Sequence, residues 1–300
     1  MSHFDHIDGD PLIIASISGG KDSAALSLWL TEQEIEHERV FADTGWEAQE
    51  TYDYLRGPLT DKIGPITEVR SDRQMVDWIR HKAMFPSRVR RWCTDELKVK
   101  PMFRHFFDRA DETGRPIVNA IGIRAAESLA RSKMPEWDGH SSRRGAFDIW
   151  RPLILWTGED VIDIHQRHGL TPNPLYFAGA ERVGCWPCIH SRKSEIRFIA
   201  EHDPGRIDLI ADLEDEVTIA ADARAAAKGI TNQNPRTWFA GRSPSAGPGR
   251  PGAERIRDVV EWSKTARGGR QYLLIDEPDP EGGCVRWGMC EHPETTAGDE

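Results

Sequence analysis

The fold of this chain is restricted most strongly by an apolar segment that runs through a pair of glycines into a second apolar segment. Residues 12–17 (Leu-Ile-Ile-Ala-Ser-Ile) are apolar and rich in isoleucine, a composition typical of a buried strand. The strand pattern ends at Ser18-Gly19-Gly20, and from residue 22 to residue 30 apolar side chains recur at helical spacing. A strand that turns directly into a helix predicts one unit of an α/β domain.

Strand and helix patterns continue to alternate further along the chain. Strands are predicted at residues 38–42 and 116–123, and helices at residues 48–55, 75–81 and 100–110. This alternation predicts a doubly wound, mostly parallel α/β sheet. Residues 136–146 are polar and rich in Gly, Ser and Arg, which predicts a loop.

The C-terminal third has a different pattern, which predicts a second part of the protein. Residues 159–168, 191–202, 204–228 and 255–266 predict helices, and residues 231–253 predict a Pro/Gly-rich linker or lid. We therefore expect a nucleotide-binding domain at residues 1–200. A helical C-terminal extension that ends in an acidic tail is expected at residues 201–300.

Composition excludes some classes of partner. The formal net charge is −10, which argues against broad electrostatic binding along a nucleic-acid duplex. Local basic clusters remain, either as phosphate sites or as solvated surface, at Arg88-Val89-Arg90-Arg91, Arg143-Arg144 and Arg192-Lys193. No apolar run is long enough to span a bilayer, and the first residues lack a secretory-signal pattern, so we expect a cytoplasmic protein with no membrane partner.

The turn after the first strand has the chemistry of a phosphate-binding loop. Ser18-Gly19-Gly20-Lys21-Asp22-Ser23 places glycines and a lysine where backbone N–H groups of a helix N-terminus can hold an anion. The spacing differs from that of a Walker A loop. Two more turns, Asp43-Thr44-Gly45 and Gly122-Ile123-Arg124, follow predicted strands. Because the carboxyl ends of parallel strands meet at one sheet edge, all three turns are expected to border one ligand site.

Five cysteines, namely Cys93, Cys185, Cys188, Cys284 and Cys290, predict metal binding or a reactive thiol. An odd number in a chain without a signal pattern makes a disulfide framework a poor explanation. The pair Cys185-Trp186-Pro187-Cys188 has the spacing of ligands to a metal or cluster, or of a redox pair.

Six motifs follow one another in the region from residue 12 to residue 197. They are Ser18-Gly19-Gly20-Lys21-Asp22-Ser23; Phe41-Ala42-Asp43-Thr44-Gly45-Trp46 with Glu50-Thr51; Gly122-Ile123-Arg124-Ala125-Ala126-Glu127-Ser128 with Arg131; Arg151-Pro152-Leu153 with Trp156 and Glu159-Asp160-Val161; Asn173-Pro174-Leu175-Tyr176; and Gly184-Cys185-Trp186-Pro187-Cys188. In this order they resemble the PAPS-reductase-like branch of the PP-loop ATP pyrophosphatase superfamily (adenine nucleotide alpha-hydrolase-like).

The resemblance implies an adenine nucleotide, ATP with Mg²⁺, as ligand. The residues that it implies for binding are Ser18, Gly19, Gly20, Lys21, Asp22, Ser23, Asp43, Thr44, Gly45, Gly122, Arg124 and Arg131. Within this set it assigns catalysis to Lys21, Asp43 and Arg124. Two structural alternatives stay open, a turn cap for Asp43 and a surface ion pair for Arg124.

The resemblance also bears on the cysteines. Arg91-Trp92-Cys93-Thr94, with Lys98 and Pro101, is similar to the C-C-x-x-R-K-x-x-P element of iron–sulfur adenylylsulfate reductases, with Thr94 at the second cysteine. This implies a [4Fe–4S] cluster with Cys93, Cys185, Cys188 and Cys290 as ligands, with Cys284 as the alternative fourth ligand. Zinc suits four cysteines equally well by chemistry alone.

Three interpretations of function follow. The first is cleavage of ATP to AMP and pyrophosphate to activate an acceptor for sulfur insertion, as in DNA phosphorothioation or tRNA thiolation, with a cysteine desulfurase as sulfur donor. The second is a sulfonucleotide reductase that forms sulfite from PAPS or APS. The third is a non-catalytic nucleotide or redox sensor. The first is preferred because Thr94 interrupts the double cysteine and the C-terminal E-C-G-[IL]-H element of the reductases is missing.

Overall fold

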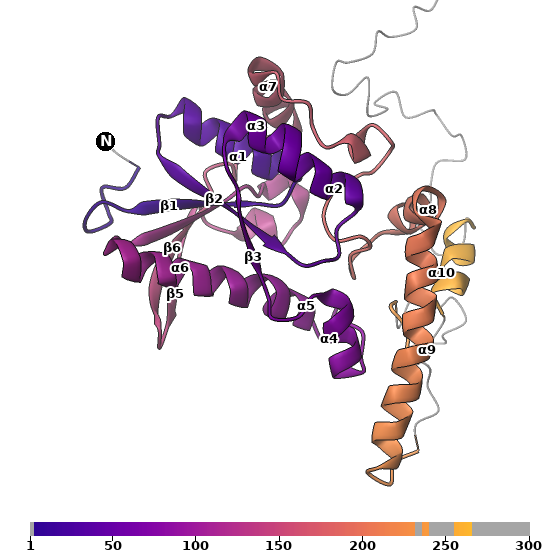
Figure 1. Cartoon of the computed structure of the whole chain (residues 1–300). Helices are drawn as coiled ribbons and strands as arrows, with labels where there is room; N and C mark the ends of the chain where they lie inside the picture. The colour runs from indigo at the N-terminus through magenta and orange to yellow at the C-terminus, as the bar shows by residue number, and fades with distance from the viewer. Residues whose placement is uncertain (1–2, 232–235, 240–254, 266–300) are drawn as a thin grey trace, which may run out of the picture.

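The structure is a computed structural model, and it describes residues 3–231, 236–239 and 255–265. Within these residues a six-stranded sheet has the strand order β3-β2-β1-β4-β6-β5 (Figure 1). The strands are β1 (Leu12–Ile17), β2 (His37–Asp43), β3 (Thr67–Arg70), β4 (Ile117–Ile121), β5 (Trp137–Ser142) and β6 (Gly145–Trp150). Pairing is parallel except between β5 and β6, so the predicted α/β sheet is confirmed.

Helices cover both faces of this sheet (Figure 1). The α-helices of the described residues are α1 (Lys21–Glu32), α2 (Gln49–Tyr54), α3 (Thr60–Ile63), α4 (Met75–Lys82), α5 (Trp92–Thr94), α6 (Lys100–Thr113), α7 (Gly158–His168), α8 (Lys193–His202), α9 (Pro204–Ala226) and α10 (Ile256–Ser263). Of these, α8, α9 and α10 lie to one side of the sheet (Figure 1). Successive side chains of β1 show why two layers form. Ile13 and Ile17 pack in one core with α1, whereas Leu12 and Ile14 pack in another with Phe106 of α6.

The prediction of a loop at residues 136–146 is wrong. These residues form β5 and the start of β6, a hairpin at the edge of the sheet. Trp137 lies opposite Trp150, and their rings stack with centroids 5.2 Å apart. The polar composition of β5 does not predict a strand, because an edge strand needs at most one apolar face. The hydrogen bonds of β5 come from its pairing with β6. The short strand β3 was also missed, since it carries no buried apolar run.

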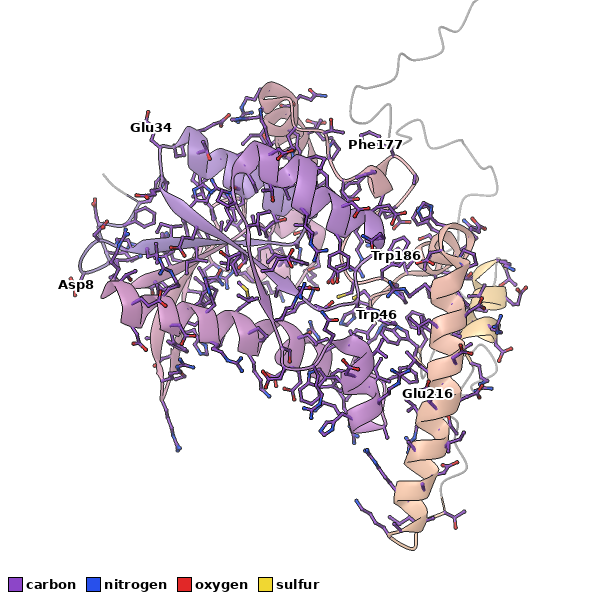
Figure 2. The ribbon with its side chains drawn as sticks, in the orientation of Figure 1. Asp8, Glu34, Trp46, Phe177, Trp186 and Glu216 are labelled. Carbon is purple, nitrogen blue, oxygen red and sulfur yellow. The ribbon has the colours of Figure 1, made fainter. Side chains whose placement is uncertain are left out.

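The helices α8, α9 and α10 pack with α4 and the turn after β2 around a third core. Trp46 and Trp186 lie where this core meets the sheet (Figure 2), and the backbone N–H of Trp186 donates to the carbonyl of Trp46 at 2.8 Å. The buried carboxylate of Glu214 on α9 accepts hydrogen bonds from the backbone N–H groups of Trp238 and Ile256, each at 3.1 Å. One buried carboxylate therefore attaches two later segments of the chain to α9.

Most of the predicted linker or lid lies outside the described residues, as do the acidic tail, Cys284 and Cys290. The division into residues 1–200 and 201–300 stays a prediction. Among the described helices, none combines the length and the apolar character that a membrane span requires.

Candidate functional site

The predicted phosphate loop joins β1 to α1 and is closed by its own hydrogen bonds. The Oγ of Ser23 donates to the carbonyl of Gly20 at 2.9 Å, and the backbone N–H of Ser18 donates to the same Oγ at 3.1 Å. Gly19 has φ of +74°, and a Cβ there would lie 2.9 Å from Cγ2 of Thr51. Glycine is therefore required at this turn. Gly20 has no side chain to cap α1, so an anion can be bound by the N–H groups of the first turn that other side chains do not engage.

The Asn173-Pro174-Leu175-Tyr176 motif supports this loop from the other side. The Nδ2 of buried Asn173 donates to the carbonyl of Gly19 at 3.3 Å. The hydroxyl of Tyr176 accepts from the backbone N–H of Lys21 at 3.3 Å, and the Lys21 ammonium lies 5.3 Å from the centre of the Tyr176 ring. Tyr176 belongs to a predicted motif, but its contact with the phosphate loop was not predicted.

The turn after β4 is held against the start of α1. The Nε of Arg124 pairs with Oδ1 of Asp22 at 2.5 Å, and both side chains are largely buried. A Cβ on Gly122 would lie 2.4 Å from the carbonyl oxygen of Asp22, so only glycine fits here. Arg131 pairs with Glu127. For Arg124 the ion-pair alternative is thus observed, although its partner belongs to the phosphate loop and both groups lie inside the molecule.

The Asp43-Thr44-Gly45 turn after β2 is engaged in its own network. Asp43 is 2% exposed, and its carboxylate accepts from the Gly45 N–H at 2.9 Å, the Tyr52 hydroxyl at 2.7 Å and Nε of Arg70 at 2.7 Å. The open alternative, a turn cap, is what the structure shows for Asp43. Its role toward the nucleotide stays a prediction.

The same turn holds the cysteine loop. Glu47 and Cys185 form an isolated antiparallel bridge, and Nε1 of Trp46 donates to the carbonyl of Pro187 at 3.0 Å. The carboxylate of Glu47 is buried and lies 3.9 Å from Sγ of Cys185. Glu47 was not among the predicted site residues, and its only mark in the sequence is its place directly after Asp43-Thr44-Gly45-Trp46.

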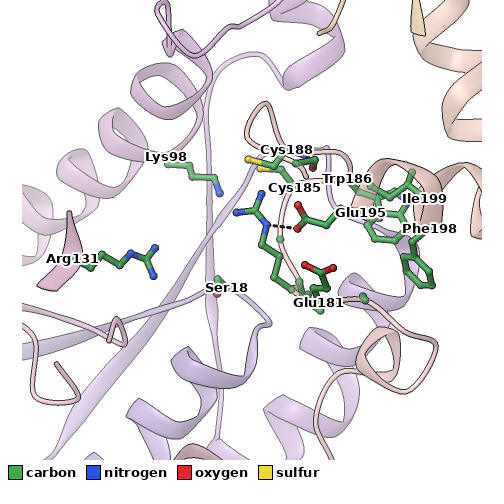
Figure 3. A pocket seen from close by; sticks show the side chains of 15 residues that line it. Ser18, Lys98, Arg131, Glu181, Cys185, Trp186, Cys188, Glu195, Phe198 and Ile199 are labelled. Atoms are coloured by element: carbon green, nitrogen blue, oxygen red, sulfur yellow. Dashed lines mark hydrogen bonds and ion pairs between the residues drawn. The ribbon is translucent and has the colours of Figure 1, made fainter. Parts of the chain in front are cut away.

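A cavity of about 270 Å³ connects the phosphate loop with the cysteine loop. Ser18 of the phosphate loop and Arg131 contribute to one part of its wall, and Cys185 and Cys188 contribute to another (Figure 3). Lys98, which follows α5, also lines it, as do Arg182, Glu181, Glu195 and Ser191. Residues from separate parts of the sequence therefore border one chamber, which we call the cysteine chamber.

Cationic side chains face both thiols in the cysteine chamber. Burial raises the pKa of the Cys185 thiol to about 11, and the Lys98 ammonium offsets part of that rise. The negative charge that Cys185 carries when ionised raises the pKa of Lys98 in turn. Arg182 interacts with Cys188 and pairs with Oε1 of Glu195 at 2.5 Å. The Sγ of Cys188 also accepts from the backbone N–H of His190 at 3.4 Å. The cations offset part of the cost of burying an ionised sulfur, whereas the raised pKa of Cys185 still favours its neutral thiol.

Cys93 packs in the same core as Cys185 and Cys188, and burial raises the pKa of its thiol. In the part of the chain that the structure describes, no three His, Cys, Asp or Glu side chains are grouped closely enough to bind one metal ion. The predicted fourth ligand, Cys290, and its alternative, Cys284, lie outside the described residues. Thiolates around a four-iron cluster stand farther apart than ligands of one ion, because the cluster lies between them. The chemistry of the three thiols and their cationic neighbours fits such a cluster.

Trp238 and Phe239 anchor their segment to the body of the protein. Both are buried, and the Trp238 ring stacks on Trp46 with centroids 4.9 Å apart. Because neither ring is exposed, the pair holds its segment to the protein and offers no face on which a nucleic-acid base could stack.

Comparison with known proteins shows the family. The model described as "Phosphoadenosine phosphosulfate reductase domain" matches residues 12–191. An uncharacterized 37.8 kDa protein of Escherichia phage 186 is 31% identical, with 93% of this chain and 96% of that protein aligned. The chain therefore belongs to the phosphoadenosine phosphosulfate reductase domain family, within the PP-loop class of nucleotide-acting proteins, as its motifs predict.

Two further relatives have assigned names. Adenosine 5'-phosphosulfate reductase of Mesorhizobium japonicum is 28% identical over 58% of this chain and 65% of its own length. This chain thus spans less than two thirds of that reductase. A solved phosphoadenylyl-sulfate (PAPS) reductase from Candida auris, in complex with phosphate, is 16% identical with a TM-score of 0.46. The aligned region covers 61% of this chain and 85% of the Candida auris chain.

Proposed function

We propose that this protein cleaves ATP to AMP and pyrophosphate in order to activate an acceptor for sulfur insertion in nucleic acid. The cysteine chamber carries the proposal, because one cavity borders both Ser18 of the phosphate loop and the thiols of Cys185 and Cys188. A nucleotide on the loop then has its reacting phosphate directed toward sulfur-bearing groups. Positioning of this kind is a large part of catalysis in nucleotidyl transfer.

The proposed chemistry has three steps. An oxygen of the acceptor attacks the α-phosphorus of ATP, the bond to the bridging oxygen breaks, and pyrophosphate leaves with the bonding electrons. Lys21 and the N–H groups at the start of α1 stabilise the charge on the phosphates. A persulfide sulfur from an external donor, such as a cysteine desulfurase, then attacks the activated acceptor, and AMP leaves with the bonding electrons and the acceptor oxygen. This joins donor and acceptor through a disulfide. A second thiol, supplied as an external reductant, attacks the donor sulfur of that disulfide, which releases the thiolated acceptor and leaves the donor as a disulfide. Arg131 and Lys98 line the chamber in which that negative charge develops.

For the cysteines we propose a [4Fe–4S] cluster held by Cys93, Cys185, Cys188 and Cys290. Support comes from the shared packing of the first three and from the cationic side chains that face two of them. When bound, the cluster would supply electron-transfer or sulfur-handling chemistry next to the nucleotide. Lys98 and Arg182 would tune it through charge and hydrogen bonds to its thiolate ligands.

The acceptor in this proposal is DNA, as in phosphorothioate modification, with tRNA as the alternative. The choice rests on the resemblance of the motifs to sulfurtransferases that act with ATP. The net charge of −10 requires a localised basic surface or a partner protein for any such contact.

A second candidate is a sulfonucleotide reductase, which the assigned relatives favour. In that reaction a thiolate attacks the sulfur of the sulfonate, and the nucleotide leaves as AMP or its 3'-phosphorylated form. A thiol reductant then releases sulfite from the S-sulfonated intermediate. The same chamber suits this chemistry, but Thr94 at the second position of the double cysteine departs from the reductase pattern.

The experiment that separates the two uses one anaerobically purified sample, assayed with ATP and with PAPS or APS. Pyrophosphate from ATP without sulfite from the sulfonucleotides supports the proposal. Sulfite release that depends on a thiol, without cleavage of ATP, refutes it in favour of the reductase. Nucleotide binding with neither product supports the non-catalytic sensor.

Replacement of the loop lysine gives a sharper check. In Lys21→Ala, pyrophosphate release is expected to fall about 100-fold, because one preorganised phosphate contact is lost. Lys62→Ala is the matched control, since Lys62 is exposed and makes no ion pair with any described residue. Normal turnover in Lys21→Ala, with Lys62→Ala also normal, contradicts the phosphate-loop assignment.

A further inference from the structure

Positive charge is concentrated in the segment that includes α4 and α5. From Arg73 to Thr94 the sequence contains six Arg or Lys residues and one Asp, in a chain whose net charge is −10. This stretch comprises α4, α5 and the connection between them. We name its cationic and indole side chains the basic face: Arg73, Trp78, Lys82, Arg88, Arg90, Arg91 and Trp92.

Most of the arginines on the basic face lack an anionic partner. Within the described residues, Arg73, Arg88, Arg90 and Arg91 form no ion pair with any carboxylate, and all four are exposed. By contrast, Arg80 on the same helix pairs with Glu216 at 2.7 Å. Arg88, Arg90 and Arg91 fall within four residues of the sequence, and like charges held near one another repel, so an external polyanion gains favourable interactions by binding there.

Indole rings lie among these cations. The Lys82 ammonium lies 4.5 Å from the centre of the Trp78 ring and 5.7 Å from that of Trp92, and the Arg73 guanidinium lies 5.3 Å from Trp78. Both indoles are partly exposed. Aromatic faces interleaved with cations are the combination on which single-stranded nucleic acid binds, through base stacking and phosphate contacts.

The segment of the basic face leads directly into a residue that lines the cysteine chamber. Trp92 directly precedes Cys93 in α5, and Lys98, five residues after Cys93, lines the chamber. Trp92 and Cys93 pack against the same hydrophobic core as Cys185 and Cys188. A strand held on this surface therefore lies beside the region where the proposed function places its sulfur chemistry.

We infer that the basic face binds the sugar–phosphate backbone of single-stranded nucleic acid and presents it to the cysteine chamber. The inference rests on the proposed function for the reaction, but the binding itself requires no turnover. A bilayer fits this face less well, because Val89, at 93% exposure, is the only large aliphatic side chain between Arg88 and Trp92.

The test is fluorescence anisotropy with a fluorescein-labelled oligothymidine, measured between about 50 and about 200 mM salt. For the triple variant Arg88→Ala/Arg90→Ala/Arg91→Ala we expect affinity to fall at least about tenfold. The slope of log K against log salt should fall by about 2, as expected when three phosphate contacts to a single strand are lost. The triple Arg→Lys variant should retain most of the slope, since it keeps the charge.

The matched control removes the same charge elsewhere, in Lys62→Ala/Arg143→Ala/Lys228→Ala. These three side chains are exposed and unpaired within the described residues. The inference is overturned if both triple alanine variants lose the same affinity for the oligonucleotide, or if Arg88→Ala/Arg90→Ala/Arg91→Ala loses none. It is also overturned if the wild type binds phosphatidylglycerol vesicles but not the oligonucleotide. Pyrophosphate release from ATP is measured separately. Oligonucleotide binding that depends on the basic face, without ATP cleavage, supports this inference and refutes the proposed function. ATP cleavage without such binding supports the proposed function and refutes this inference.

Discussion

Gly122 lies where the turn after β4 comes closest to the phosphate loop, and its replacement by alanine tests the architecture of the site directly. A Cβ at this position would lie 2.4 Å from the carbonyl oxygen and 2.9 Å from the carbonyl carbon of Asp22, and 3.2 Å from Cβ of Leu26. The nearest atoms belong to the backbone of the first turn of α1, so no side-chain rotation relieves the contact. Either the turn or the helix must move.

The size of the effect follows from this geometry. A carbon and an oxygen that are not bonded need roughly 3.3 Å or more, so the two segments must separate by close to 1 Å. Overpacking of this kind costs about 1–3 kcal/mol of folding free energy. The upper half of that range is expected, because the displaced segments also share the ion pair between Arg124 and Asp22. Movement of the helix N-terminus should weaken nucleotide binding about tenfold, which corresponds to about 1.4 kcal/mol.

Urea unfolding measures the first effect and calorimetric titration with ATP the second. Gly205→Ala is the control, since a Cβ at Gly205 meets only Oδ1 of Asp203, at 3.6 Å, and alanine suits the start of α9. The control should be neutral or slightly stabilising. If Gly122→Ala unfolds at the wild-type urea concentration and binds ATP within twofold of wild type, the close approach of β4 and α1 is refuted.

Two further predictions concern the cysteines and the buried carboxylate of α9. Cys185→Ser should remove iron, sulfide and visible absorbance from anaerobically purified protein. Cys290→Ser should have the same effect, whereas Cys284→Ser should retain all three. Unchanged iron in Cys185→Ser excludes Cys185 as a ligand. Burial raises the pKa of Glu214 from 4.5 to about 7, so the folded protein holds this proton more tightly than the unfolded chain does. The free energy of unfolding should therefore fall by about 3 kcal/mol between about pH 4.5 and a pH above 7. In Glu214→Gln, the free energy of unfolding measured with urea should change less over this pH range. An identical pH profile in the variant contradicts the raised pKa of Glu214.

Much of the sheet was predictable because its central strands are buried on both faces. Such strands read as continuous apolar runs, and β1 is observed at residues 12–17, as predicted. The turns that follow β1, β2 and β4 were predictable as well, since glycine next to polar residues marks a turn in any context. The edge hairpin at residues 137–150 was not, because the hydrogen bonds of β6 and the stacking of two tryptophans stabilise it rather than any local pattern.

The site divides in the same way. The sequence alone determined which residues have phosphate-binding and thiol chemistry, because glycine, lysine and cysteine carry these properties wherever they lie. Only the tertiary structure decided that Glu47 faces Cys185, that Arg124 pairs with Asp22 and that Arg182 faces Cys188. The first two contacts join segments more than 100 residues apart, and a side chain's local neighbours carry no information about them. The third lies within one loop, whose conformation depends on what it packs against. The parallel sheet is the physical reason for the long-range contacts, because it brings the carboxyl ends of distant strands to one edge. The cysteine chamber lies at that edge, between Ser18 and the cysteine loop.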